Sequence, residues 1–253
     1  MIQYNPLQYL PTAEELPDSD DTPVDNELQN LIPNLLRAIL ALNWADRMDW
    51  FLGIDMGVYY DPGKEAIVPD GFLSLGVERF KGGGKLRLSY VLWQENYIVP
   101  SLVLEVVSKK PGSEYDRKMT KYAEIGVLYY VIYNPDYGRR DKHSAFEVYR
   151  LVDGIYESQK GNPVWMPEIG LGIGCEVGTH EGYVREWLYW YDQEGNRFPA
   201  PDQVIEQERQ RAEQEHQRAE QERQRAEKLL QQLDSLRVRL LEQGIDLDLE
   251  EDN

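Results

Sequence analysis

The sequence predicts an α/β (α+β) domain, in which helices flank a mixed β-sheet, followed by a charged C-terminal helix. Short apolar runs separated by turn residues fill the middle of the chain and predict several strands. A strand–helix–strand passage from Leu102 to Tyr133 favours a mixed sheet. The last part of the chain repeats one charged heptad, which is typical of a solvated helix.

Changes in composition divide the chain into three parts. Residues 1–24 are rich in Pro and Asp and predict an irregular acidic segment. Residues 25–200 carry the apolar runs and predict the folded domain. Residues 201–253 predict a heptad-repeat helix with an acidic end.

The folded domain should begin with an amphipathic helix. Apolar residues follow Asp25 and Asn26 at a spacing of three or four, so either residue is a candidate N-cap. Pro33 lies inside this pattern, and it predicts that the first turns are separate or kinked.

The predicted strands lie in WFLGIDMGVYY, AIVPDGFLSLGV, LRLSYVLW, SLVLEVVS and LYYVIYNP, with a last strand in WLYWYDQEGNRF. SLVLEVVS is almost entirely apolar, as expected of a central strand that is buried on both faces. A helix is expected from Tyr115 to Gly126, and a hairpin about Asp153 and Gly154.

The tail repeats QERQRAE, with one variation, from residue 207 to residue 227. In one register, position a holds Ile205, Ala212, Ala219, Ala226, Leu233 and Leu240, and position d holds Glu208, Glu215, Glu222, Leu229 and Leu236. Glutamate at position d is unfavourable in a coiled coil, so the first half favours a solvated helix. The leucines could close a short homodimer seam, and a passive helix is the alternative.

Composition limits the class of protein and of cofactor. No apolar stretch reaches the length of a membrane span and the N-terminus lacks the pattern of a signal peptide, so we expect a cytoplasmic protein. One cysteine, Cys175, and three scattered histidines offer no site for zinc or iron–sulfur. A metal would therefore bind to carboxylates, which favours Mg²⁺ or Mn²⁺.

The net charge of −18 argues at first against a nucleic-acid partner. Residues 1–36 and 240–253, however, contain thirteen acids and no Lys or Arg, which leaves only −5 for residues 37–239. The middle of the chain is therefore close to neutral and can still carry a basic strip. No phosphate-binding loop is present, because Gly82, Gly83 and Gly84 lack the Lys and Ser or Thr of such loops.

Three acids in predicted strands are candidates for chemistry. Glu105 lies in the middle of a buried strand, where an ionised carboxylate must be paired or bind a metal. Asp70 ends another apolar run, and Asp55 lies in a third. If the strands of Asp70 and Glu105 are neighbours, both carboxylates can bind one cation. The alternatives are a core glutamate bonded to Arg or Tyr and a turn aspartate that caps backbone.

Nearby lysines could stabilise negative charge on a phosphate or orient an attacking water. The candidates are Lys109, Lys110, Lys118 and Lys121. Lys118 and Tyr122 are four residues apart, so a helix presents both on one face. Each lysine could instead be a solvated surface charge.

The segments VPDGFLSLG, PSLVLEVVSKK and YDRKMTKYAEIGVLYYVIYNP together resemble the Uma2 family of bacterial restriction endonucleases, within the PD-(D/E)XK nuclease superfamily. DNELQ, DMGVYY and LYWYDQEGNRFPAP also fit, so the resemblance covers roughly residues 25–198. It implies a restriction-endonuclease-like fold and an endonuclease that cleaves DNA with Mg²⁺ or Mn²⁺.

The resemblance also implies roles for individual residues. Asp70 matches the first motif acid and Glu105 the second, so both would be catalytic and bind the metal. The motif lysine normally stands two residues after the second acid, where this chain has Val107. Lys118 has the family's spacing for a lysine on the following helix instead. Glu27 is similar to an extra acid that some members use.

Two other functions compete with a nuclease. Val107 and the acidic net charge favour a catalytically degenerate module that keeps the fold for binding or assembly through the C-terminal helix. Two carboxylates could also serve a glycosidase, which would need no metal. The many Trp and Tyr residues fit sugar stacking only superficially, because aromatic residues are common in strands for packing reasons.

Overall fold

The computed structural model describes residues 9–17, 26–82, 85–109 and 113–243. Most of the predicted irregular segment 1–24 lies outside these residues, as do Asp25, Lys110 and the acidic end after residue 243. The chain divides into two compact units, Met1–Pro201 and Asp202–Asn253.

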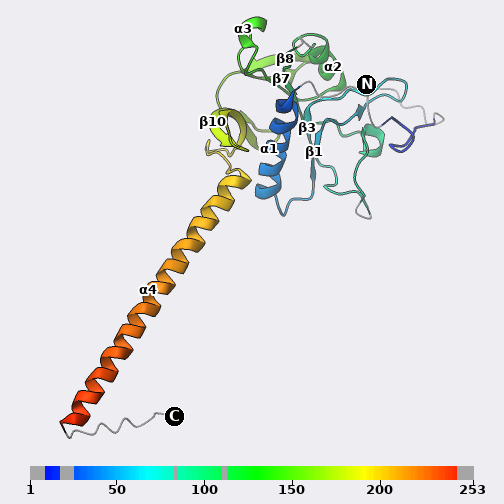
Figure 1. The fold of residues 1–253 in the computed structure, drawn as a ribbon. Coiled ribbons are helices and arrows are strands. Elements are labelled where there is room, and N and C mark those ends of the chain that lie inside the picture. The colour runs from blue at the N-terminus through cyan, green and yellow to red at the C-terminus, as the bar shows by residue number, and fades with distance from the viewer. Residues whose placement is uncertain (1–8, 18–25, 83–84, 110–112, 244–253) are drawn as a thin grey trace. The chain divides into compact units, whose positions relative to one another are not determined.

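A six-stranded mixed sheet forms the centre of the first unit, with the strand order β1-β3-β5-β6-β7-β8 (Figure 1). The β5–β6 pair is parallel, and the other neighbours are antiparallel. The mixed α+β fold predicted from the sequence is therefore confirmed. The bounds are β1 (Trp50–Ile54), β3 (Gly71–Leu75), β5 (Leu102–Val106), β6 (Tyr129–Tyr133), β7 (Phe146–Val152) and β8 (Ile155–Gln159).

The two central strands are β5 and β6, and every residue in both is buried. Helix α2 (Arg117–Ile125) connects them and ends at Gly126, whose φ of 94° is left-handed. The predicted helix thus ends where expected but begins two residues later than expected. The predicted hairpin at Asp153 and Gly154 is confirmed between β7 and β8, with positive φ at both residues.

Helix α1 (Glu27–Asn43) packs against β1 and β5 (Figure 1). Asn26 is its N-cap, and its side chain accepts hydrogen bonds from the backbone N–H groups of Leu28 and Gln29. The prediction that Pro33 separates or kinks the first turns was wrong in one respect, because α1 is a single continuous helix. Pro33 is buried against β3, where Gly71 leaves room for its ring. Packing therefore offsets the missing backbone hydrogen bond.

Two predicted strands are shorter than the sequence indicated. WFLGIDMGVYY breaks at Asp55, whose φ of 46° ends β1, and resumes as β2 (Val58–Tyr59). LRLSYVLW contributes only β4 (Tyr90–Val91), which pairs with β2 in parallel and leads into a 3-10 helix at Leu92–Gln94. Apolar residues alone did not specify a strand there, because short apolar runs fit several local structures.

A second, antiparallel sheet contains β9 (Val164–Met166), β10 (Leu171–His180) and β11 (Tyr183–Tyr191). Strand β11 was predicted from the sequence, whereas β9 and β10 were not. Strand β9 has only three residues, and glycines interrupt the apolar pattern of β10. One of them, Gly174, is required by space, since a Cβ there would come within 2.8 Å of the Tyr191 ring. A short helix, α3 (Gly138–Asp141), follows β6.

The main sheet has a buried core on each face. The α1-side core includes Leu104 and Val106 of β5, together with apolar residues of α1 and β11. The α2-side core includes Val103, Val107 and Tyr122. Successive residues of β5 thus point to opposite faces, as strand geometry requires.

Helix α4 (Pro201–Glu242) makes up the described part of the second unit and has no buried residue. Ion pairs link Arg209 to Glu206, Arg211 to Glu215, and Arg223 to both Glu220 and Glu227. Among the helices of the described residues, none combines the length and apolar character needed to cross a membrane.

The contact of Pro33 with Gly71 gives a test of how α1 packs on the sheet. A Cβ at residue 71 would lie 2.9 Å from Pro33 Cβ, so Gly71→Ala forces α1 and β3 apart. We expect a loss of about 1–3 kcal/mol in the free energy of unfolding, measured by urea titration. Gly82→Ala is the control, since a Cβ at residue 82 meets nothing within 4 Å. Equal stability of both variants would contradict the packing described here.

Candidate active site

Asp70, which directly precedes β3, and Glu105 of the neighbouring β5 face the same side of the sheet. Gly71 of β3 pairs with Leu104 of β5, so continuing this antiparallel register by one residue places Asp70 opposite Glu105. The backbone N–H of Val106 donates a hydrogen bond of 2.6 Å to Asp70 Oδ2. The neighbouring strands that a shared cation would require are therefore present.

Two side chains of α2 bind the carboxylate of Glu105. Lys118 Nζ lies 2.7 Å from Oε2, and the Tyr122 hydroxyl donates a hydrogen bond of 2.5 Å to Oε1. Glu105 and Tyr122 are each 1% exposed, whereas the Lys118 side chain is 31% exposed. Lys118 therefore connects the buried carboxylate with the solvent. The spacing of four residues puts both side chains on the face of α2 that covers β5.

The pKa values of both acids are raised. Burial, followed by the negative charge of Glu105, raises the pKa of Asp70 to about 8, although the Val106 N–H opposes the shift. Burial likewise raises the pKa of Glu105, against the opposing charge and hydrogen bond of Lys118. This pair of acids is therefore short of positive charge.

Lys118 and Tyr122 remain protonated in this environment. Burial lowers the pKa of Lys118, but the charge and hydrogen bond of Glu105 outweigh it and leave that pKa above its ordinary value. Burial, followed by the charge of Glu105, holds the pKa of Tyr122 well above its ordinary value. Both groups are therefore hydrogen-bond donors to Glu105.

The site has the chemistry that a hard divalent cation prefers. The strand register places two buried carboxylates opposite one another. Burial raises the pKa values of both, and a cation bound between them would stabilise their charged forms. A carboxylate has about four lone-pair positions, so the hydrogen bonds to Glu105 leave room for a cation. Within the described ranges, no group of three or more His, Cys, Asp or Glu side chains could hold a metal ion. Asp70 and Glu105 are the two carboxylates that the strand register brings opposite one another.

Val107 stands where the common motif has its lysine, and it is 3% exposed in the α2-side core. Its side chain lies among apolar residues, while the ammonium group beside Glu105 comes from α2. The other lysines lie elsewhere or are not described. Lys121 Nζ lies 4.6 Å from the centre of the Tyr60 ring, Lys109 is exposed, and Lys110 is outside the described residues.

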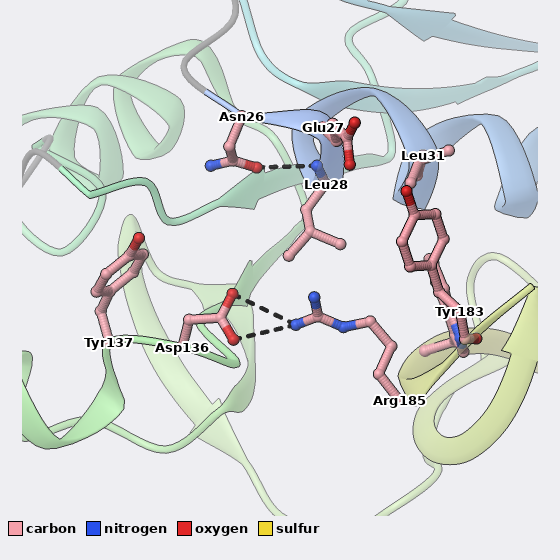
Figure 2. Close-up of a pocket in the computed structure, with 9 residues that line it drawn as sticks. Asn26, Glu27, Leu28, Leu31, Asp136, Tyr137, Tyr183 and Arg185 are labelled. Atoms are coloured by element: carbon pink, nitrogen blue, oxygen red, sulfur yellow. Dashed lines mark hydrogen bonds and ion pairs between the residues drawn. The ribbon is translucent and has the colours of Figure 1, made fainter.

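Asp55 and Glu27 do not join Asp70 and Glu105 in the same way. The backbone N–H of Asp55 donates to the carbonyl oxygen of Asp70, but its side chain is exposed at the end of β1. Glu27 begins α1, and its exposed side chain lines a different pocket of about 390 Å³. Figure 2 shows this pocket, in which the ion pair of Asp136 and Arg185 faces the first turn of α1.

Glu114, a third acid close to the site, was not among the candidates predicted from the sequence. Glu114 is 7% exposed, and its charge contributes to raising the pKa values of both Asp70 and Glu105. The Tyr130 hydroxyl donates to its backbone carbonyl and fixes this segment just before α2. No clear sequence signal marked Glu114, because it precedes the predicted helix and lies in no apolar run.

A comparison with protein families matches residues 20–179 to the Uma2 model, described as "Putative restriction endonuclease". The match covers more than half of the chain and includes Asp70, Glu105 and Lys118. The chain belongs to the Uma2 family. The resemblance seen in the sequence is thereby confirmed, and membership in Uma2 supports a nuclease function. A search of curated proteins found no match.

The raised pKa of Asp70 predicts a pH-dependent stability. Folding favours the protonated carboxyl, so its contribution to stability is complete below pH 3.8 and is lost as the pH rises through about 8. Asp70→Asn keeps an oxygen that accepts from Val106 N–H and removes the charge. We expect this variant to be more stable than the wild type above pH 8 when divalent cations are absent. The difference in the free energy of unfolding should be on the order of 3–5 kcal/mol.

Chemical denaturation at pH 5 and at pH 8.5 in a chelator would measure this difference, which should shrink at the lower pH. Asp46→Asn changes an exposed aspartate and serves as the control, with an expected effect below about 0.5 kcal/mol. An Asp70→Asn variant that is no more stable than the wild type at pH 8.5 would contradict the raised pKa.

Proposed function

We propose that this protein is an Mg²⁺- or Mn²⁺-dependent endodeoxyribonuclease, which hydrolyses phosphodiester bonds of DNA. The observation that carries the proposal is the placement of Asp70 opposite Glu105, with Lys118 bonded to Glu105. Family membership supports the nuclease activity. The metal, the DNA substrate and the roles of the residues are our inference from this geometry.

Asp70 and Glu105 would hold the metal ion, since they are buried oxygen donors on one face of neighbouring strands. A bound Mg²⁺ supplies positive charge that lowers the pKa of a water and polarises the phosphate. The Val106 N–H keeps Asp70 in place, and Tyr122 keeps Glu105 in place. These contacts fix both carboxylates before a substrate binds, which favours catalysis.

Lys118 would stabilise the negative charge that develops on the phosphate, or orient the attacking water. Its ammonium group is held at Glu105 and is partly exposed, so it can contact a substrate and the buried acids together. In this proposal α2 replaces the strand position of Val107 as the source of the catalytic lysine. Residues 25–200 would form the nuclease domain, and residues 201–253 would do no chemistry.

A second candidate function is a binding or assembly module that retains the nuclease fold. Val107 in the motif position favours it, as do the internal hydrogen bonds that satisfy both oxygens of Glu105. In this function Lys118 and Glu105 would form a structural ion pair. The presence of Asp70 opposite Glu105 speaks against it, because a structural pair needs no second buried acid.

Cleavage of supercoiled plasmid DNA with Mg²⁺ or Mn²⁺ tests the nuclease directly. We expect the wild type to nick the plasmid, and Asp70→Ala and Glu105→Gln to lose this activity, because each removes a carboxylate of the proposed metal site. Glu124→Gln, on the exposed side of α2, is the matched control and should cleave normally. A folded wild type that cleaves no DNA form with either metal would favour the binding module.

Lys118→Ala separates catalysis from metal binding. We expect the cleavage rate to fall by roughly 100-fold or more, because a donor to developing charge is lost. Metal affinity, measured by calorimetry with Mn²⁺, should persist because both carboxylates remain. Lys121→Ala, one turn away and in contact with Tyr60, should retain wild-type rates. Equal rates for the two variants would remove Lys118 from the mechanism.

We also propose that α4 mediates homodimer formation. Its Leu229, Leu233 and Leu236 side chains are 54–61% exposed and follow a heptad spacing. A second copy of the same helix would cover this seam.

A further inference from the structure

The apolar seam of α4 occupies only its last part. Leu229, Leu233, Leu236 and Leu240 alternate between positions d and a, and together they span about three turns of helix. The preceding heptads place Ala212, Ala219 and Ala226 at position a and glutamates at position d. The helix therefore changes from a charged half to an apolar half near residue 226.

A parallel, in-register pair of helices would bring the charged halves together. Position d faces itself in that arrangement, so Glu208, Glu215 and Glu222 would each oppose the same residue of the second copy. The flanking g and e positions would also place Arg218 opposite Arg223. These contacts between like charges disfavour parallel pairing.

Charged side chains in the first half of α4 already form ion pairs with residues of the same helix. Arg209 pairs with Glu206, Arg211 with Glu215, and Arg223 with residues 220 and 227, all at spacings of three or four residues. A partner helix along this half would compete with these pairs. The charged half therefore favours water as its neighbour.

An antiparallel pair avoids these contacts. Position a then faces position d, so Leu233 packs on Leu236 and Leu229 on Leu240 of the second copy, and each contact occurs twice. With this alignment residue 226 of one helix lies opposite residue 243 of the other. The overlap thus covers residues 226–243 and leaves the charged heptads outside it.

The residues that flank this seam are compatible with antiparallel pairing. Leu230 at position e would face Arg237, and Gln232 at position g would face Arg239, so no like charges meet. The alkyl stem of Arg237 can cover Leu230, while the guanidinium group stays in water. A shift of one heptad toward the N-terminus would oppose Leu240 and Glu222, and a shift of one heptad toward the C-terminus would oppose Leu233 and Gln243. The register described here pairs all four leucines with leucines.

We infer that residues 226–243 of α4 form a short antiparallel coiled coil with a second copy of this chain. The inference rests on the self-association proposed above and not on the nuclease activity. The N-terminal ends of the two α4 helices, where the folded domains join, then lie at opposite ends of the pair. One dimer thereby presents two nuclease-family domains that are joined through the tail.

Light scattering across a concentration series tests whether the seam associates. We expect the full-length chain to be dimeric and Leu236→Glu to be monomeric, because the variant buries charge in the seam. Leu241→Glu is the matched control and should remain dimeric, since Leu241 is 53% exposed at position b, and Leu236 is 54% exposed at position d. If the wild type is monomeric, or if both variants lose the dimer to the same extent, the proposed seam is wrong. Neither result would affect the nuclease proposal.

The distance between spin labels at residue 217 tests the orientation. Gln217 lies at the outward position f, and Cys175→Ser removes the native thiol before Gln217→Cys is labelled. The antiparallel pair separates the two labels by about 50 Å along the axis, at 1.5 Å per residue. A dimer with a label distance under about 25 Å would be parallel and would overturn the orientation.

Discussion

The pairing of β3 with β5 is the constraint on which the rest of the site depends. Antiparallel register at Gly71 and Leu104 sets Asp70 and Glu105 opposite one another on the face that α2 covers. Both carboxylates are buried, so their charges repel in a medium that screens them poorly. The chain keeps this arrangement although hydrophobic residues at the same places would fold more easily, which points to a use for it.

The surrounding elements act on this pair in different ways. Helix α2 supplies one ammonium group and one hydroxyl to Glu105, whereas Asp70 receives the backbone N–H of Val106. The position two residues after Glu105 belongs to the hydrophobic core, because Val107 packs there among apolar side chains. A lysine on α2 can nevertheless reach the same carboxylate, since the helix lies directly over the strand.

In the second unit, the long helix α4 has no buried residue, so no hydrophobic core stabilises it. Its charged half is stabilised only weakly, by exposed ion pairs at spacings of three and four residues. Its apolar half exposes leucines that water solvates poorly. Because only the second half is apolar, the pairing that we propose is limited to residues 226–243, and the two helices run antiparallel.

Sequence alone determined the features that depend on local patterns. The burial of β5 and β6, the start of α1 at a cap formed by Asp25 or Asn26, the end of α2 at Gly126 and the hairpin at Asp153 all follow from residue type and spacing. The combination of motifs also identified the Uma2 family and selected Asp70, Glu105 and Lys118 as candidates. These signals are local patterns, or short motifs that follow one another in a fixed order, so a single sequence is enough to detect them.

Only the tertiary structure decided which side chains meet. It paired β3 with β5, brought Glu114 near the two acids and placed Glu27 in another pocket, because these relations depend on contacts between distant residues. It also kept α1 continuous through Pro33 and formed β10 despite its glycines, where packing outweighs local preference. Helix preferences amount to under about 1 kcal/mol per residue for most residue types and to about 3 kcal/mol for proline, and the summed contacts across a buried core exceed them.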